Sequence, residues 1–133
     1  MNAYDVLVLG PHGPSRADLE KTLRRLGHAV VAAELERGPE LAAGERYDVV
    51  VVDVRADEVD PRVLADAGGP EWSALLLVAD QPRKLADLLR GRAPGGLMVL
   101  TGAESDGGYQ VALSVCAALR RARAAQEVGP ALA

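Results

Sequence analysis

Short, uninterrupted apolar runs recur along the chain and alternate with segments in which leucines are spaced as on one face of a helix. The four valines at 49–52 are the clearest run, because no polar residue alternates with them. Such a run is typical of a strand that is buried on both faces of a parallel sheet. The same reasoning predicts strands over 6–9, 29–33, 49–52, 74–78 and 96–100.

The segments between these runs carry the marks of helices. Leu19, Leu23 and Leu26 share one face of a helix whose first turn contains Ser15, spaced from Asp18 as in a capping box. Gly27 is well placed to end this helix in a left-handed conformation. Further helices are predicted at 39–44, from Pro61, from Pro82 to Leu89 and over 109–128.

The last predicted helix has a clear apolar face. We expect this face to point inward, the arginines at 120, 121 and 123 to point mostly outward, and Gly129 and Pro130 to end the helix. Residues 101–108 before it are small and polar, and we predict a loop there. The expected inward residues are Val111, Val115, Ala118, Leu119 and Ala122.

Five strands that alternate with five helices indicate an α/β fold with a parallel sheet, since parallel neighbours need right-handed crossovers that place helices on the faces. The expected architecture is a three-layer α/β/α sandwich. A length of 133 residues with 49% hydrophobic composition fits one domain. We assign residues 1–125 to this domain and 126–133 to a C-terminal tail or linker.

The net charge and the cysteine content limit the kinds of function that we expect for this chain. The net charge is -4 and the basic and acidic residues are interspersed, so we expect no direct binding to nucleic acid. Cys116 is the only cysteine, which leaves no internal disulfide, and we expect it to be a small core or interface residue. No apolar stretch approaches the roughly 20 residues that cross a bilayer, and the N-terminus lacks the pattern of an export signal. We therefore expect no membrane association and a cytoplasmic location.

Asp53 directly follows the four-valine strand, so its carboxylate is expected at the carboxyl edge of the sheet. The residues leave several roles open for it: a solvated group, an acceptor of backbone N–H bonds, a contact with a partner, or part of a displaced cation site with Asp57, Glu58 and Asp60. The turn at 10–14 matches no phosphate-binding loop, and its two prolines remove two donors.

The remaining chemistry-bearing residues do not form a catalytic pattern. His12 and His28 offer no zinc spacing with the lone cysteine, and we expect His28 to be a surface residue at a helix end. There is no nucleophile elbow, no pair of catalytic carboxylates and no Cys–His arrangement. We expect a protein that is not an enzyme.

Three local strings resemble the receiver domain of bacterial two-component response regulators. They are Leu-Arg-Arg-Leu-Gly-His-Ala-Val-Val at 23–31, Tyr-Asp-Val-Val-Val-Val-Asp at 47–53 and Gly-Leu-Met-Val-Leu-Thr at 96–101. The resemblance extends to about residue 125. It implies a flavodoxin-like (βα)5 sandwich with strand order 2-1-3-4-5, whose ligands lie at the carboxyl ends of the strands. It also makes Asp53 the equivalent of the phosphoacceptor.

The resemblance fails at the positions that assist this aspartate. Gly10 and Pro11 replace the acidic pair that helps to hold Mg²⁺, Ala79 replaces a Ser or Thr, and Leu100 replaces the lysine. These departures indicate a pseudo-receiver that requires no cofactor and does not bind Mg²⁺. We expect Leu100, Ala79 and Pro11 to fill the space that the missing groups leave.

The resulting hypothesis is an atypical receiver domain in signal transduction or transcription regulation that acts by protein–protein interaction. Its partner would be another protein, a fused effector domain or a second copy in a homodimer. The family's dimerisation surface would here contain Arg83, Lys84 and Asp87 together with the arginines of the last helix. Two alternatives stay open: a small-ligand-binding flavodoxin-like domain that uses the crevice near 10–15, and a receiver still phosphorylated at Asp53.

Overall fold

The computed structural model describes residues 3–38, 40–41, 47–55, 75–81, 83, 87 and 97–132. At residues 75, 97–98 and 123–132 only the backbone is described. The helix predicted from Pro61, most of the helix predicted at 82–89, and the acidic residues 57, 58 and 60 lie outside the described residues. Arg83 and Asp87 are helical and exposed.

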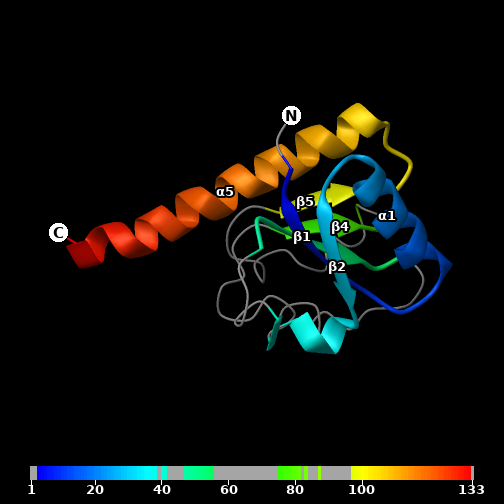
Figure 1. Ribbon diagram of the computed structural model, residues 1–133, viewed down its shortest axis with the longest axis horizontal. Coiled ribbons are helices and arrows are strands. Elements are labelled where there is room, and N and C mark those ends of the chain that lie inside the picture. The colour runs from blue at the N-terminus through cyan, green and yellow to red at the C-terminus, as the bar shows by residue number, and fades with distance from the viewer. Residues whose placement is uncertain are drawn as a thin grey trace.

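A parallel sheet forms the centre of the molecule (Figure 1). Its strand order is β2-β1-β3-β4-β5, and every described pairing is parallel. The predicted strands and their predicted order are therefore confirmed. The strands are β1 (Asp5–Leu9), β2 (Ala29–Ala33), β3 (Val49–Asp53), β4 (Leu75–Val78) and β5 (Leu97–Leu100).

The register brings the carboxyl ends of the strands to one edge. In β3, Val52 aligns with Leu9 of β1 and with Leu77 of β4, and Asp53 aligns with Val78. The hydrogen-bond ladder continues past the strand ends, since Val54 N donates to Val78 O. Segments that are far apart in sequence thereby place their next residues side by side at this edge.

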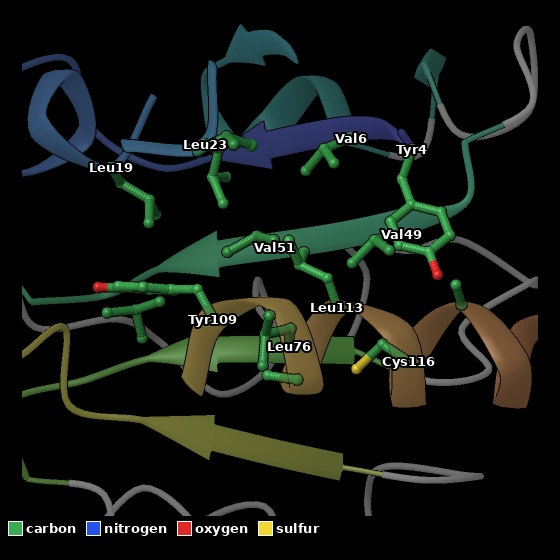
Figure 2. Packing of buried hydrophobic residues seen from close by; sticks show 14 residues of the cluster. Tyr4, Val6, Leu19, Leu23, Val49, Val51, Leu76, Tyr109, Leu113 and Cys116 are labelled. Atoms are coloured by element: carbon green, nitrogen blue, oxygen red, sulfur yellow. The ribbon is translucent and has the colours of Figure 1, made fainter. Parts of the chain in front are cut away.

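Alternate residues of each strand enter two separate apolar layers. One layer lies between the sheet and the helices α1 (Pro14–Arg25) and α5 (Asp106–Leu132), as Figure 2 shows. The other lies on the opposite face, where Leu35 of the short 3-10 helix η1 (Leu35–Arg37) packs against Leu7 and Val50. Every residue of β3 is buried, which confirms that both faces of the sheet are covered.

The two ends of α1 have different causes. The helix begins at Pro14, whose fixed φ suits a first helical position, and Gly13 is the N-cap without a side-chain bond. The predicted capping box of Ser15 and Asp18 is therefore wrong: Ser15 already lies inside the helix. The predicted end is confirmed, because Gly27 has φ +98°, a conformation that favours glycine.

The last helix differs from its prediction at both ends and in its orientation. It begins at Asp106, which shortens the predicted loop at 101–108, and continues through Gly129 and Pro130 to Leu132. The expected inward residues are exposed instead, with Val111 at 62%, Val115 at 40% and Leu119 at 42%. The residues that face the sheet are Tyr109, Ala112, Leu113, Cys116 and Ala117.

This error has a physical cause. Both faces of α5 are apolar at helical spacing, so the spacing identifies the helix without choosing between its faces. The larger side chains Tyr109 and Leu113 fill the space against Val51 and Leu76 in the layer shown in Figure 2. One apolar face of α5 is thus packed, and the other is exposed.

His28 was predicted at the surface and is instead only 4% exposed. Its Nδ1 accepts a hydrogen bond from the backbone N–H of Tyr4 at 3.1 Å, and its Nε2 lies 2.8 Å from Oε1 of Gln110. With Nδ1 accepting, Nε2 carries the hydrogen that is donated to Gln110. The imidazole also stacks on Tyr4, so it connects the start of β1 with α5.

A matched pair of substitutions tests the orientation of α5. We expect Leu113→Ala to lower the free energy of unfolding by about 3 kcal/mol, because it leaves a cavity in the core. Leu119→Ala makes the same chemical change on the exposed face and should cost no more than about 0.5 kcal/mol. Chemical denaturation at low protein concentration measures both. The reverse order of the two costs would contradict the observed orientation.

Candidate functional site

The carboxylate of Asp53 is almost fully buried, with 2% of the residue exposed, and is held by one arginine. The guanidinium of Arg55 donates from Nε to Oδ1 at 2.9 Å and from NH2 to Oδ2 at 3.0 Å. The backbone N–H of Arg55 donates a third bond to Oδ1 at 3.1 Å. Both carboxylate oxygens therefore accept hydrogen bonds from the same residue.

The spacing of the two residues explains this local pairing. Val54 continues the ladder beyond β3 through its N–H bond to Val78 O. In extended backbone, residues two apart point to the same side, so Asp53 and Arg55 emerge on one side of the strand end. A planar guanidinium can then meet the carboxylate through two parallel bonds, the strongest arrangement for such a pair.

Arg55 also joins the loops around Asp53. Its NH2 donates to the backbone carbonyl of Ser15, in the first turn of α1, at 2.8 Å. Gly102 has φ +90°, and a Cβ built there would overlap the Arg55 guanidinium. The absence of a side chain at Gly102 therefore makes room for Arg55. The hydrogen bond to Asp53 is the main cause that raises the pKa of Arg55, so the guanidinium stays charged.

Gly10 approaches Asp53 too closely to carry a side chain. A Cβ built at Gly10 would lie 2.8 Å from the backbone O of Asp53 and 3.3 Å from its Cβ. This is the position at which the resemblance calls for an acidic residue. A carboxylate there would require the backbone of β1 or β3 to move, so the glycine belongs to the packing of these two strands.

The expected filling of the site by Leu100, Ala79 and Pro11 did not include its charged neighbour. Ala79 is buried and its N–H donates to Leu100 O, while the Leu100 side chain packs against the layer under α1 and α5. The side chain that reaches Asp53 is the charged Arg55. Sequence reasoning gave Arg55 no role, although period-two spacing after a strand-end carboxylate was a signal that could have found it.

Polar groups of the turn between β1 and α1 form hydrogen bonds with residues at the end of β2 and in α1. The N–H of Gly10 donates to Ala33 O, and the N–H of His12 donates to Oε1 of Glu34 at 3.2 Å. NH1 of Arg16 donates to Gly10 O at 3.0 Å and lies 3.6 Å from the same Glu34 oxygen. The turn is thus tied to the end of β2.

Glu104 organises the turn between β5 and α5. Its carboxylate accepts bonds from Thr101 N at 2.8 Å, from Thr101 Oγ1 at 3.0 Å and from Gly102 N at 2.9 Å. Burial alone would raise the pKa of Glu104, but these donors outweigh it and lower the pKa. Glu104 thus fixes the backbone N–H of Gly102, the residue whose missing side chain leaves room for Arg55.

Tyr109 brings α5 to the same edge. Figure 2 shows its hydroxyl pointing in the direction of the strand arrowheads, and its ring belongs to the buried layer. Burial, and secondarily the negative charge of Glu104, raise the pKa of the Tyr109 hydroxyl. The phenol is therefore neutral at physiological pH and can act as a hydrogen-bond donor at this edge.

These residues do not fit a Mg²⁺ site. Mg²⁺ favours six oxygen ligands and usually takes more than one carboxylate from a protein, whereas both oxygens of Asp53 already bind a guanidinium. Gly10 and Pro11 contribute no carboxylate. Among the residues described, no group of three or more His, Cys, Asp or Glu side chains is placed to hold a metal ion.

The sheet and its strand order can be compared with known structures. Ten solved chains match, among them the signal receiver domain of a modulated diguanylate cyclase from Desulfovibrio desulfuricans G20, described as an example of alternate folding. The similarity has a TM-score of 0.60 at 16% sequence identity and covers 92% of this chain and 99% of that one. This chain has a receiver-domain fold.

The receiver-domain fold appears at low sequence identity, so the likeness concerns backbone architecture and not the residues of the site. No protein-family model matches the chain. No curated protein matches it either. The roles of Asp53 and its neighbours therefore have to be argued from their own geometry.

The close approach at Gly10 can be tested with two glycines. We expect Gly10→Ala to lower the free energy of unfolding by about 1–3 kcal/mol, because the new Cβ meets the backbone of Asp53. Gly107→Ala is the control, since its Cβ would meet only Ser105 Oγ at 4.0 Å in the first turn of α5. There alanine should stabilise the helix by up to about 1 kcal/mol. Thermal unfolding of both variants should shift in opposite directions; a harmless Gly10→Ala would contradict the packing described.

The strength of the Asp53–Arg55 pair can be measured by a double-mutant cycle of Asp53→Ala and Arg55→Ala. We expect a coupling energy of about 2 kcal/mol, between the values for exposed and fully buried pairs, because Arg55 retains 17% side-chain exposure. The control cycle uses Arg25→Ala and Asp106→Ala, an equally close pair with both side chains more than half exposed. That coupling should be much smaller. Equal couplings would mean that burial adds nothing to the Asp53–Arg55 pair.

Proposed function

We propose that this chain is an atypical receiver-type signalling domain that acts through protein–protein interaction, without Mg²⁺-dependent phosphorylation of Asp53. The observation that carries the proposal is the bidentate Asp53–Arg55 pair. A carboxylate that accepts a phosphoryl group attacks with one of its oxygens, and a metal ion usually neutralises the incoming charge. Here both oxygens are engaged, and the neighbouring cation is a guanidinium that belongs to the chain.

The same pair supports a role as a fixed module. Arg55 supplies the positive charge that a strand-end carboxylate needs, and it does so without an external ion. It donates to Ser15 O in the first turn of α1, and its guanidinium occupies the space beside Gly102 in the turn after β5, so one side chain spans segments that follow β1, β3 and β5. A domain held in this way presents a constant surface to a partner.

The structural neighbour supports a regulatory role that is not itself catalytic. That protein is the receiver domain of a diguanylate cyclase, so its fold serves there beside an enzyme. By analogy we propose that the partner of this chain is a fused effector domain or a separate protein, in signal transduction or transcription regulation and in the cytoplasm. In the parts of the chain that the structure describes, no helix is long and apolar enough to cross a membrane.

The two alternative functions gain no support from the described geometry. A small ligand in the crevice at 10–15 would have to compete with Glu34 and Arg16 for the polar groups of that turn. A phosphodonor at Asp53 would have to displace three hydrogen bonds from Arg55. Neither alternative explains why the chain carries an arginine at this position.

Intact-mass spectrometry after incubation with acetyl phosphate or phosphoramidate and Mg²⁺ tests the proposal. We expect no phosphoryl adduct on the wild-type chain, because the carboxylate is engaged and no metal site adjoins it. Asp53→Asn serves as the negative control, and a receiver domain of known competence serves as the positive control. An adduct on the wild type that is lost in Asp53→Asn would restore the phosphorylation switch and overturn the proposal.

A further inference from the structure

Within the part of the chain that the structure describes, β2 is an edge strand of the sheet, because the strand order begins with it. On the free side of an edge strand, the backbone N–H and C=O groups of every second residue have no neighbouring strand. The N–H of Ala29 donates to Tyr4 O, so Ala29 directs its backbone groups to β1. Successive residues of a strand alternate in this direction, so Val30 and Ala32 direct their backbone groups away from β1.

A side-chain hydrogen bond gives independent evidence for this outward direction. NH2 of Arg24, an exposed residue of α1, donates to Val30 O at 3.3 Å. The side chain reaches this carbonyl because the carbonyl points away from β1. The other outward groups of the strand are the N–H of Val30 and both backbone groups of Ala32. These groups form a free edge at which a further strand can add.

The residues of β2 lack the features that usually prevent an edge strand from pairing with another chain. Its sequence Ala-Val-Val-Ala-Ala contains no charged residue and no proline, and its five residues align with β1 without a bulge. Val31 adds exposed apolar surface, since 44% of it is exposed on the face of the sheet opposite α1. An uncharged, apolar edge of this kind is a template for pairing with another strand.

The symmetry of the edge selects a second copy of this chain as the added strand. In an antiparallel pair of strands, two opposite residues exchange two N–H···O bonds. If two β2 strands run antiparallel with each Val31 opposite its equivalent, Val30 of each copy faces Ala32 of the other. All the outward groups then pair, in two such exchanges. Sliding one strand by two residues would instead place Ala32 opposite His28, whose N–H already donates to Leu23 O.

The charges at the two ends of the edge are complementary under the same symmetry. Glu34 follows the end of β2 and its side chain is 50% exposed, whereas Arg24 lies beside Val30 and its side chain is 55% exposed. Both lie on the α1 side of the sheet, because Glu34 contacts Arg16 of that helix. An antiparallel pair brings the Glu34 end of each strand toward the Arg24 end of the other, whereas a parallel pair would bring like charges together.

We propose that β2 is a contact between two copies of this chain, which pair these strands antiparallel about a two-fold axis at Val31 and join their sheets. The contact is isologous, because each copy contributes the same residues. It lies at the opposite end of the sheet from β5 and uses no residue of α5, so it is distinct from the dimerisation surface that the receiver resemblance implies. The inference rests on the proposed function as an interaction module and adds a partner for it.

The first measurement is sedimentation equilibrium of the wild type over a wide range of concentrations, with Ala32→Pro and Leu119→Asp alongside. Ala32→Pro removes an outward N–H from each copy and leaves the bonds to β1 intact. We expect a reversible wild-type dimer that Ala32→Pro weakens about tenfold or more, because two hydrogen bonds across the axis are lost. Leu119→Asp changes the exposed face of α5, where Leu119 is 42% exposed, and should leave the dimer unchanged.

Circular dichroism establishes that both variants fold, and Val31→Lys replaces Ala32→Pro if that variant does not. A dimer that Leu119→Asp disrupts and Ala32→Pro does not would overturn the proposal, since the copies would then meet through α5.

Disulfide cross-linking tests the axis and the direction of the strands. Opposite residues that exchange no hydrogen bonds have Cα atoms about 4.5 Å apart, a separation that a disulfide can bridge. We therefore expect Val31→Cys to cross-link with itself, while the native Cys116 is buried and should not react. Ala29→Cys is the control on the same face of β2: in the antiparallel pair Ala29 lies opposite Ala33 and should not cross-link with itself. A parallel pair would cross-link both variants and would overturn the proposed geometry.

A wild type that stays monomeric at every concentration would overturn the second-copy proposal and assign the β2 edge to an extended segment of a different protein. That result would leave the phosphodonor experiment on Asp53 as the separate test of the proposed function.

Discussion

Asp53 stands at the end of β3, a strand in which every residue is buried, and a carboxylate in that position must be compensated. Transfer of an unpaired charge into a protein interior costs several kcal/mol, roughly the net stability of a small domain. Arg55 compensates it with two bonds from the guanidinium and one from the backbone. Two neighbouring segments are fitted to this pair, because the guanidinium needs space at Gly102 and an acceptor at Ser15.

The chain around the pair is adjusted to it. Gly10 allows β1 to pass close to the backbone of Asp53, and Glu104 fixes the turn that contains Gly102. A side chain at Gly10 would collide with β3, and a cation beside Asp53 would have to displace a charge that is already paired. This chain thus combines a receiver-domain fold with a strand-end carboxylate that is paired with an arginine of the same chain.

Most of the fold could be predicted from the sequence. Runs such as the valines at 49–52 identify buried parallel strands, because a strand covered on both faces has no polar alternation. Gly27 marked the end of α1 for an equally local reason, since its left-handed backbone conformation suits glycine. The site was predicted less well. The position of Asp53 at the strand end could be predicted from the pattern, and the resemblance singled out Gly10, Pro11, Ala79 and Leu100, but neither predicted that Arg55 pairs with Asp53.

The sequence by itself determined the five parallel strands, the helix after the first strand and the carboxylate at the strand end, because these follow from the spacing of apolar residues along the backbone, whereas the strand order came from the resemblance to receiver domains. Tertiary structure decided which face of α5 packs against the sheet and which stays exposed. Both faces are apolar, and only the fit of Tyr109 and Leu113 over the strands distinguishes them. It also decided that Arg55 turns inward to Asp53 and that His28 is buried against Tyr4. Such choices depend on neighbours that lie far away in the sequence or on space that exists only once the strands are assembled.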